Sequence, residues 1–276
     1  PGIGKSRLLF EFSQQLHTHG PVTYLEGHCL SYAMATPYSL VLEVLRAHCA
    51  IATADGDDVI AEKVHRTLAV LGVDADRTFA CLLHLLGVRG AVDMLSGTSP
   101  DTLKAHTFAA LKQLWITSGQ RRPLVIAVED LHWIDPTSEE FVTTLVDSLP
   151  GAAVLLLATY RPGYRAPWVE KSYTTQLTLP PLSAKDSVHV VRAVLNQQTA
   201  LPPLADAILA KAEGNPFFLE ELVHMLVQRP IPADASPDGS VTPRQSIDLH
   251  LPPTVEAVLA ARIDRAEARL MIAIAR

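Results

Sequence analysis

The sequence predicts an α/β fold in which helices cover both faces of a parallel sheet. Two uninterrupted apolar runs, at 124–128 and 152–159, are typical of strands that are buried on both faces of such a sheet. A shorter strand is predicted at 22–26, directly after a Gly20-Pro21 turn. Because strands and helices alternate along this part of the chain, we expect right-handed crossovers within one α/β layer.

Helices are predicted where apolar residues recur at helical spacing. The first, at 5–17, carries an apolar stripe that would pack on the sheet, formed by Leu8, Leu9, Phe12 and Leu16. Further helices are expected between the first two strands, at 37–50, 59–71, 79–86 and 102–116. Others follow the last strand, at 184–195, 203–212 and 216–227.

The composition excludes several classes of protein. The chain has 276 residues, a formal net charge of −6 and 48% hydrophobic residues, so it can bury a full core and is not expected to be disordered. Direct nucleic-acid binding through a basic face is excluded, because phosphate neutralisation needs clustered Lys and Arg. No apolar stretch approaches the roughly 18 residues of a membrane-spanning helix, so no membrane contact is expected.

The cysteines and histidines give no metal signal. Cys29, Cys49 and Cys81 lack CxxC spacing and are odd in number, so we expect neither disulfides nor a zinc site, as in the reducing cytoplasm. Cys29 could be a redox thiol, but a small buried hydrophobic residue is favoured. Metal binding by histidine is disfavoured because His17 and His19 are two residues apart, whereas neighbours on a helix surface are three or four apart.

The chain opens on PGIGKS, which matches the end of the phosphate-binding pattern GxxxxGK[ST]. Gly2 and Gly4 permit a tight turn whose backbone N–H groups face an anion, and the following helix directs its positive end there. Lys5 would contact the β- and γ-phosphates, and the Ser6 hydroxyl would complete a Mg²⁺ shell. The alternative is an ordinary glycine-rich turn before a helix. The predicted nucleotide-binding residues in this motif are Gly2, Ile3, Gly4, Lys5, Ser6 and Arg7.

A second motif supports nucleotide binding. The predicted strand at 124–128 leads directly into Glu129 and Asp130, and ligands bind at the carboxyl ends of strands in such sheets. We assign Glu129, together with Ser6, to Mg²⁺ and Asp130 to the attacking water. The alternative is that both acids cap the next helix, but Asp135 followed by Pro136 already forms a good helix start.

Arg161 follows the predicted strand at 152–159. A cation at the tip of a strand beside the phosphate site can sense the γ-phosphate, and Arg161 therefore joins Glu129 and Asp130 as a candidate catalytic residue. A surface arginine before Pro162 is an equal alternative from the sequence alone.

Several segments, in this order along nearly the whole chain, resemble the STAND-type signalling ATPases of the AAA+ group. The likeness is greatest to the ATPase modules of bacterial adenylate/guanylate cyclase-linked proteins and of large ATP-binding LuxR-type regulators. The segments are PGIGKSRL (1–8), EGHCLSY (26–32), TPY (36–38), RPLVIAVEDLHWID (122–135), LLLATYRP (155–162), EGNPFFLEELV (213–223) and LPPTVEAVLAARIDR (251–265).

The resemblance implies roles for individual residues. Lys5 and Ser6 would be the Walker A pair, and Glu129 and Asp130 the Walker B acids. Arg161 would be the sensor-1 arginine. Many relatives have aspartate where this chain has Glu129, and the longer side chain is expected to change the Mg²⁺ geometry and slow hydrolysis.

The resemblance also predicts the domain order: a P-loop NTPase core at 1–180 whose first strand lies before residue 1, then a helical lid at 181–229. A flexible linker at 230–250 and the truncated start of a winged-helix-like domain at 251–276 would follow. Within the lid, Gly214-Asn215-Pro216 matches a GxP signature whose proline contacts adenine. Taken alone, this tripeptide predicts only a helix end and a helix start.

These inferences predict an ATP-binding, slowly hydrolysing switch module of a multidomain bacterial signalling protein, cyclase-linked or transcriptional. ATP and Mg²⁺ would bind between core and lid, and the nucleotide state would shift their packing. The expected partners are ATP or ADP, other domains of the same polypeptide, and further copies in a nucleotide-dependent association. Two alternatives stay open: a ring-forming AAA+ ATPase acting on a macromolecule, and a non-catalytic nucleotide-dependent scaffold.

Overall fold

In the computed structural model, which describes residues 2–16, 18, 20–73, 76–195 and 205–227, three parallel strands form a sheet within the unit Ser6–Leu177. They are β1 (Thr23–His28), β2 (Leu124–Glu129) and β3 (Val154–Ala158), in the order β1-β2-β3. In this register His28 lies opposite Glu129, so the carboxyl ends of β1 and β2 meet. The predicted α/β fold is confirmed.

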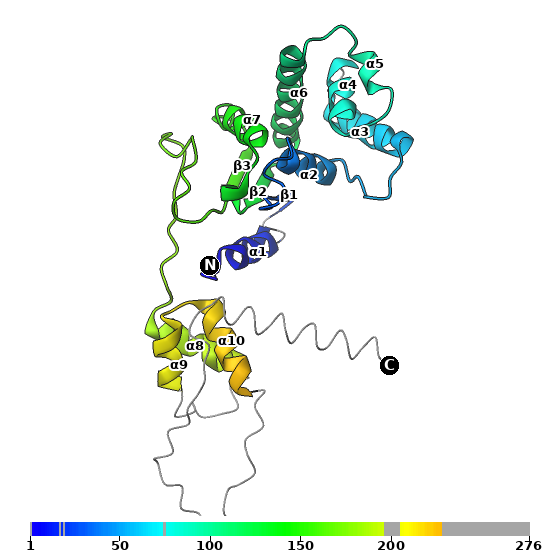
Figure 1. Ribbon diagram of the computed structural model, residues 1–276. Helices are drawn as coiled ribbons and strands as arrows, with labels where there is room; N and C mark the ends of the chain where they lie inside the picture. The colour runs from blue at the N-terminus through cyan, green and yellow to red at the C-terminus, as the bar shows by residue number, and fades with distance from the viewer. Residues whose placement is uncertain (1, 17, 19, 74–75, 196–204, 228–276) are drawn as a thin grey trace, which may run out of the picture. The chain divides into compact units, whose positions relative to one another are not determined.

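Helices cover both faces of this sheet. In Figure 1, α2, α6 and α7 lie on one side of the strands and α1 on the other, which gives three layers, while α3, α4 and α5 pack beside α6. The helices of this unit are α1 (Lys5–Leu16), α2 (Ser39–His48), α3 (Asp57–Leu71), α4 (Asp76–Leu85), α5 (Ala91–Met94), α6 (Pro100–Arg121) and α7 (Pro136–Val146), with a 3₁₀ turn η1 (Leu131–Trp133). The sequence did not predict α5 or η1.

The central strand β2 is the most buried of the three. Its residues from Leu124 to Val128 are all buried, because it has a neighbouring strand on each side and α6 against it. Behind it, Phe141 of α7 meets the rings of Phe108 and Trp115 edge to face, each at 5.2 Å between centroids. The apolar run at 124–128 therefore predicted a two-sided buried strand correctly. The same prediction for 152–159 is wrong, because β3 has a described neighbouring strand on one side alone, none of its residues is buried and Leu155 is 46% exposed.

The first strand is longer than predicted. It reaches His28 rather than residue 26, because pairing with β2 continues to the end of that strand and the Cys29 N–H then donates to the Glu129 carbonyl at 2.9 Å. Residues 26 and 28 consequently share one face of β1, since side chains alternate along a strand. This extension brings two polar side chains to the end of β2.

Among the described residues, a second, smaller unit contains Gly2–Lys5 and the segments 178–195 and 205–227. Its helices are α8 (Ala184–Val194), α9 (Ala205–Ala212) and α10 (Pro216–Val227), close to the predicted ranges. Val191, Ile208, Leu219 and Leu222 form the centre of its apolar cluster. The predicted linker at 230–250 and the predicted domain at 251–276 lie outside the described residues, and the three boundaries between the four predicted segments stay predictions.

No helix in the described part of the chain combines the length and apolar character needed to cross a membrane.

Candidate functional site

Two glycines near the N-terminus adopt left-handed backbone conformations, with φ of 76° at Gly2 and 98° at Gly4. Side chains other than glycine are strained there. A Cβ on Gly2 would also lie 2.8 Å from Asn215 Oδ1 and 2.9 Å from Phe217 Cβ, and the Gly2 carbonyl accepts a hydrogen bond from the Phe217 N–H at 3.3 Å. The tight turn predicted for this segment is present, immediately before α1 begins at Lys5.

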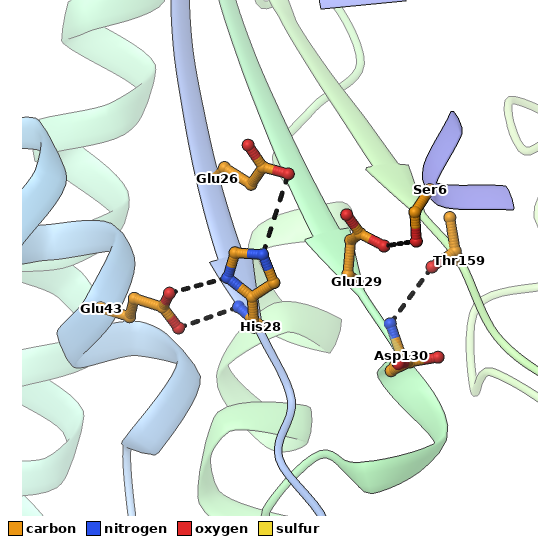
Figure 2. Close-up of polar contacts among 7 residues, drawn as sticks. All are labelled: Ser6, Glu26, His28, Glu43, Glu129, Asp130 and Thr159. Carbon is orange, nitrogen blue, oxygen red and sulfur yellow. Dashed lines mark hydrogen bonds and ion pairs between the residues drawn. The ribbon is translucent and has the colours of Figure 1, made fainter. Parts of the chain in front are cut away.

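The structure brings the two predicted Mg²⁺ ligands together. The Ser6 hydroxyl, near the start of α1, donates a hydrogen bond to the Glu129 carboxylate at the end of β2 (Figure 2). A hydroxyl and a carboxylate offer the hard oxygen ligands that Mg²⁺ prefers. The pair thus offers two of the oxygen ligands that a magnesium ion would need, and its role stays a prediction.

Asp130 lies where the chain leaves β2. Its φ of 53° is left-handed, and its N–H donates to Thr159 Oγ1 at 3.1 Å (Figure 2). The Thr159 N–H donates to the Val128 carbonyl at 2.9 Å, so the ends of β2 and β3 are tied together. The turn holds Asp130 at the carboxyl edge of the sheet next to Glu129.

Asp135, not the two acids before it, caps α7. Asp135 Oδ1 accepts a hydrogen bond from the Ser138 N–H at 2.9 Å, as the Asp-Pro sequence predicted. The same carboxylate also accepts from the Tyr38 and Ser39 N–H groups, at 3.0 and 3.1 Å. It thereby joins the start of α2 to the loop after β2, a role that the sequence did not reveal.

A polar cluster at the ends of β1 and β2 was missed by sequence reasoning. It consists of Glu26, His28 and Glu129, whose side chains converge, with Glu43 of α2 behind His28 (Figure 2). Burial first, and then the charges of Glu26 and Glu129, raise the pKa of Tyr24 to about 12. The two carboxylates of the cluster, within 4.8 Å of one another, give the strand ends a negative potential that favours a cation.

A comparison with protein families decides the class of this chain. The model of the AAA ATPase domain matches residues 1–157, more than half of the chain. The chain belongs to the AAA ATPase domain family. The matched region contains the glycine turn and the Ser6–Glu129 pair, and the membership supports nucleotide-binding ATPase activity with ATP and usually Mg²⁺ as ligands.

This AAA ATPase domain is also similar to a protein of Rhizobium meliloti (strain 1021) that is described as uncharacterized. The identity is 32% over 147 residues, which are 52% of this chain and 14% of that protein. The chain thus spans a small part of the length of this relative. No solved structure matches the chain.

Two other predicted site residues of the AAA ATPase domain stay predictions. Arg161 is exposed, three residues past the end of β3, a position that suits both the phosphate sensor and the surface arginine. The Arg7 guanidinium forms an ion pair with Glu11, at 2.5 Å between nitrogen and oxygen. Its central carbon also lies 5.7 Å from the centroid of the Phe10 ring. The Arg7 side chain therefore interacts with α1 itself.

The predicted adenine-binding tripeptide forms a helix junction. Helix α9 ends at Ala212, and α10 begins at Pro216. Asn215 accepts a hydrogen bond from the Phe218 N–H on its Oδ1, at 3.2 Å, which is an N-cap interaction with proline at the first helical position. The helix end and start are confirmed, and the adenine contact of Pro216 stays a prediction of the resemblance.

Cys29 is the small buried residue that the sequence favoured. It is 6% exposed, and burial, followed by the nearby acidic charges, raises the pKa of its thiol to about 12. A thiol that stays protonated is a poor nucleophile, so Cys29 lacks the character of a redox thiol. Cys49 and Cys81 are also buried and unbridged.

Proposed function

We propose that this chain is the ATP-binding, slowly hydrolysing switch module of a multidomain signal-transduction protein of the STAND type. The observation that carries the proposal is the contact between the Ser6 hydroxyl and the Glu129 carboxylate at the end of the central strand. Family membership supports the nucleotide, and the segments at 26–32, 122–135 and 213–223 support the signalling subclass through their resemblance. In this proposal the nucleotide state acts on other domains of the same polypeptide.

Each residue of the site has a defined task in this proposal. The backbone from Gly2 to Ser6 and the ammonium group of Lys5 hold the phosphates. The Ser6 hydroxyl can donate its hydrogen bond to the Glu129 carboxylate while a lone pair of its oxygen faces the cation, because a hydroxyl both donates and accepts. When bound, Mg²⁺ neutralises charge that develops on the phosphates during transfer.

Asp130 is proposed to orient and polarise the attacking water. Its position is held by the hydrogen bond from its N–H to Thr159, and its side chain is 45% exposed, so water can reach it. Slow turnover is part of the proposal because Glu129, at the end of β2, is longer than the aspartate of many relatives and would change the Mg²⁺ geometry.

Phosphate release by the full chain, measured over a range of protein concentrations, tests the proposal. A switch module predicts slow release with a constant rate per molecule. A rate per molecule that rises steeply with concentration would instead favour a ring-forming AAA+ ATPase, since a ring needs an arginine donated across a subunit interface.

Asp130→Asn tests the catalytic assignment. We expect release to fall about 100-fold or more, the usual contribution of a general base, while ATP binding is retained. Asp93→Asn, on an exposed position of α5, removes the same charge and should release phosphate at the wild-type rate. Wild-type turnover by Asp130→Asn would contradict the assignment, whereas ATP binding without phosphate release by the wild-type chain would favour the non-catalytic scaffold.

A further inference from the structure

We propose that Glu26, His28 and Glu129 form a binding site for a first-row transition metal ion at the carboxyl ends of β1 and β2. One ligand atom from each residue, an imidazole nitrogen and two carboxylate oxygens, lies within 4.8 Å of the others. Figure 2 shows the three side chains converging from the two neighbouring strands. Ligand atoms about 2.1 Å from one ion are at most about 4.2 Å apart, so small side-chain rotations bring all three into range.

The imidazole of His28 is held in a metal-binding orientation by Glu43. Glu43 Oε1 is 2.8 Å from Nδ1 of His28, and Glu43 Oε2 accepts a hydrogen bond from the His28 N–H at 2.8 Å. Because the carboxylate only accepts, the neutral ring carries its proton on Nδ1 and presents the Nε2 lone pair. Nε2 lies 3.9 Å from Glu26 Oε1. A carboxylate behind a histidine in this way is typical of metal ligands in proteins.

Glycine at position 27 explains why α2 reaches His28. A Cβ there would lie 2.7 Å from Val44 Cγ2 and 2.8 Å from Leu40 Cδ1, both on α2. Since glycine leaves that space open, α2 packs closely on β1 and places Glu43 against the His28 ring. The support for the imidazole is thus built into the packing of the strand.

The two ligand carboxylates need a positive partner. Their oxygens lie within 4.8 Å of one another, so the two negative charges repel. The Glu26 and His28 side chains are 39% and 46% exposed, so an ion can enter from solvent. A protonated His28 could instead neutralise the two carboxylates, which would make the cluster an internal ion triad without a metal. Titration with Zn²⁺ distinguishes the two.

The donor set selects the kind of metal. One imidazole nitrogen with two carboxylates suits Zn²⁺, Co²⁺ or Mn²⁺, whereas Mg²⁺ and Ca²⁺ prefer oxygen ligands alone. Glu129 belongs both to this site and to the Ser6 pair, so a transition metal here would draw Glu129 away from a magnesium nucleotide. This antagonism, unlike the metal site itself, rests on the proposed function.

Titration of the full chain with Zn²⁺, without nucleotide or Mg²⁺, tests the site by calorimetry. Wild-type protein should bind one equivalent, and Co²⁺ in place of Zn²⁺ should give visible absorption bands of a nitrogen-containing ligand set. His28→Gln and Glu26→Gln should each weaken binding at least about tenfold, and Glu43→Gln by about 10- to 100-fold as an orienting residue. His84→Gln, a histidine change on α4, should bind like wild type.

Two outcomes overturn the inference. One is wild-type protein that binds no Zn²⁺, as the internal ion triad predicts. The other is binding and a Co²⁺ spectrum that persist unchanged in both His28→Gln and Glu26→Gln, with folding of each variant checked by circular dichroism. A parallel titration of wild-type protein with a fluorescent ATP analogue and Mg²⁺ keeps the proposals apart: nucleotide binding without Zn²⁺ binding defeats this inference alone, and the reverse defeats only the proposed function.

Discussion

Two acidic regions that follow one another along the chain have opposite character. Asp135 is 2% exposed, and its oxygens accept hydrogen bonds from the backbone N–H groups of Tyr38, Ser39 and Ser138. Glu129, six residues earlier, lies partly exposed beside Glu26, so that one carboxylate faces another. An acid whose oxygens are satisfied by backbone donors supports the fold, whereas an acid that faces another acid is available for a ligand.

Asp135→Ala should produce the largest effect on stability. It leaves three backbone N–H groups without their acceptor at a buried position, so we expect the free energy of unfolding to fall by about 3–5 kcal/mol. Urea denaturation at neutral pH measures this. Asp147→Ala, which removes a half-exposed partner of Lys171, is the matched control and should cost about 0–1 kcal/mol. A loss below about 1 kcal/mol for Asp135→Ala would show that water replaces the carboxylate.

A partly buried histidine, His48, makes stability depend on pH. The hydrogen bond to Glu43 is the main cause that raises the pKa of His28, whereas burial lowers the pKa of His48 from 6.5 to about 4. Between pH 4 and pH 6.5 the unfolded chain binds more protons at His48 than the folded chain does, so the free energy of unfolding rises with pH. Acidification from pH 6.5 to about 4 should therefore cost up to about 3 kcal/mol through His48.

His48→Gln checks this pH dependence. Glutamine cannot be protonated, yet it retains a polar group toward Ser118, whose Oγ is 3.2 Å from His48 Nε2. Denaturation curves at several pH values between 4 and 6.5 should have a smaller pH slope for the variant than for wild type. Equal slopes would mean that His48 does not carry the effect.

Glu129→Gln should barely change stability, in contrast to Asp135→Ala. The substitution relieves repulsion with Glu26, and the amide oxygen still accepts the hydrogen bond of Ser6. We expect the free energy of unfolding to change by less than about 1 kcal/mol, as for other partly exposed charges. A loss as large as that of Asp135→Ala would mean that the strand-end cluster is structural.

Cys29 directly follows the exposed His28 and should be protected from alkylation in the native protein, with no change in its stability. Because its thiol is buried and its pKa is raised to about 12, iodoacetamide at pH 8 should modify it about 100-fold more slowly in native protein than in urea. Mass spectrometry of the alkylated peptides measures both rates. Similar rates in the two states would show that the end of β1 opens readily.

Local patterns in the sequence predicted most of the fold. The apolar run before Glu129 predicted β2, and Asp135 with Pro136 predicted the start of α7, because both signals lie within a few neighbouring residues. The same holds for the glycine turn. The Ser6–Glu129 pairing, across 123 residues, was instead implied by the two motifs together with the expected sheet.

The cluster of Glu26, His28 and Glu43 could not be predicted in this way. The two-residue spacing of Glu26 and His28 was visible, but its meaning depends on the register that sets His28 opposite Glu129, and no local pattern fixes pairing across so long a separation. Helical spacing, which disfavours metal binding by histidine in this sequence, overlooks neighbours on a strand. The added donors to Asp135 escaped prediction for the same reason, since they come from the start of α2.

Calorimetric titration of the full chain with magnesium ATP, comparing wild type with Lys5→Ala, tests the central claim most directly. The claim predicts that Lys5→Ala weakens binding by about 10- to 100-fold, because a charge-assisted contact to phosphate is lost. Lys112→Ala, which removes the same charge from α6, should bind like wild type. Wild-type affinity in Lys5→Ala would contradict the assignment of residues 2–6 as the phosphate site.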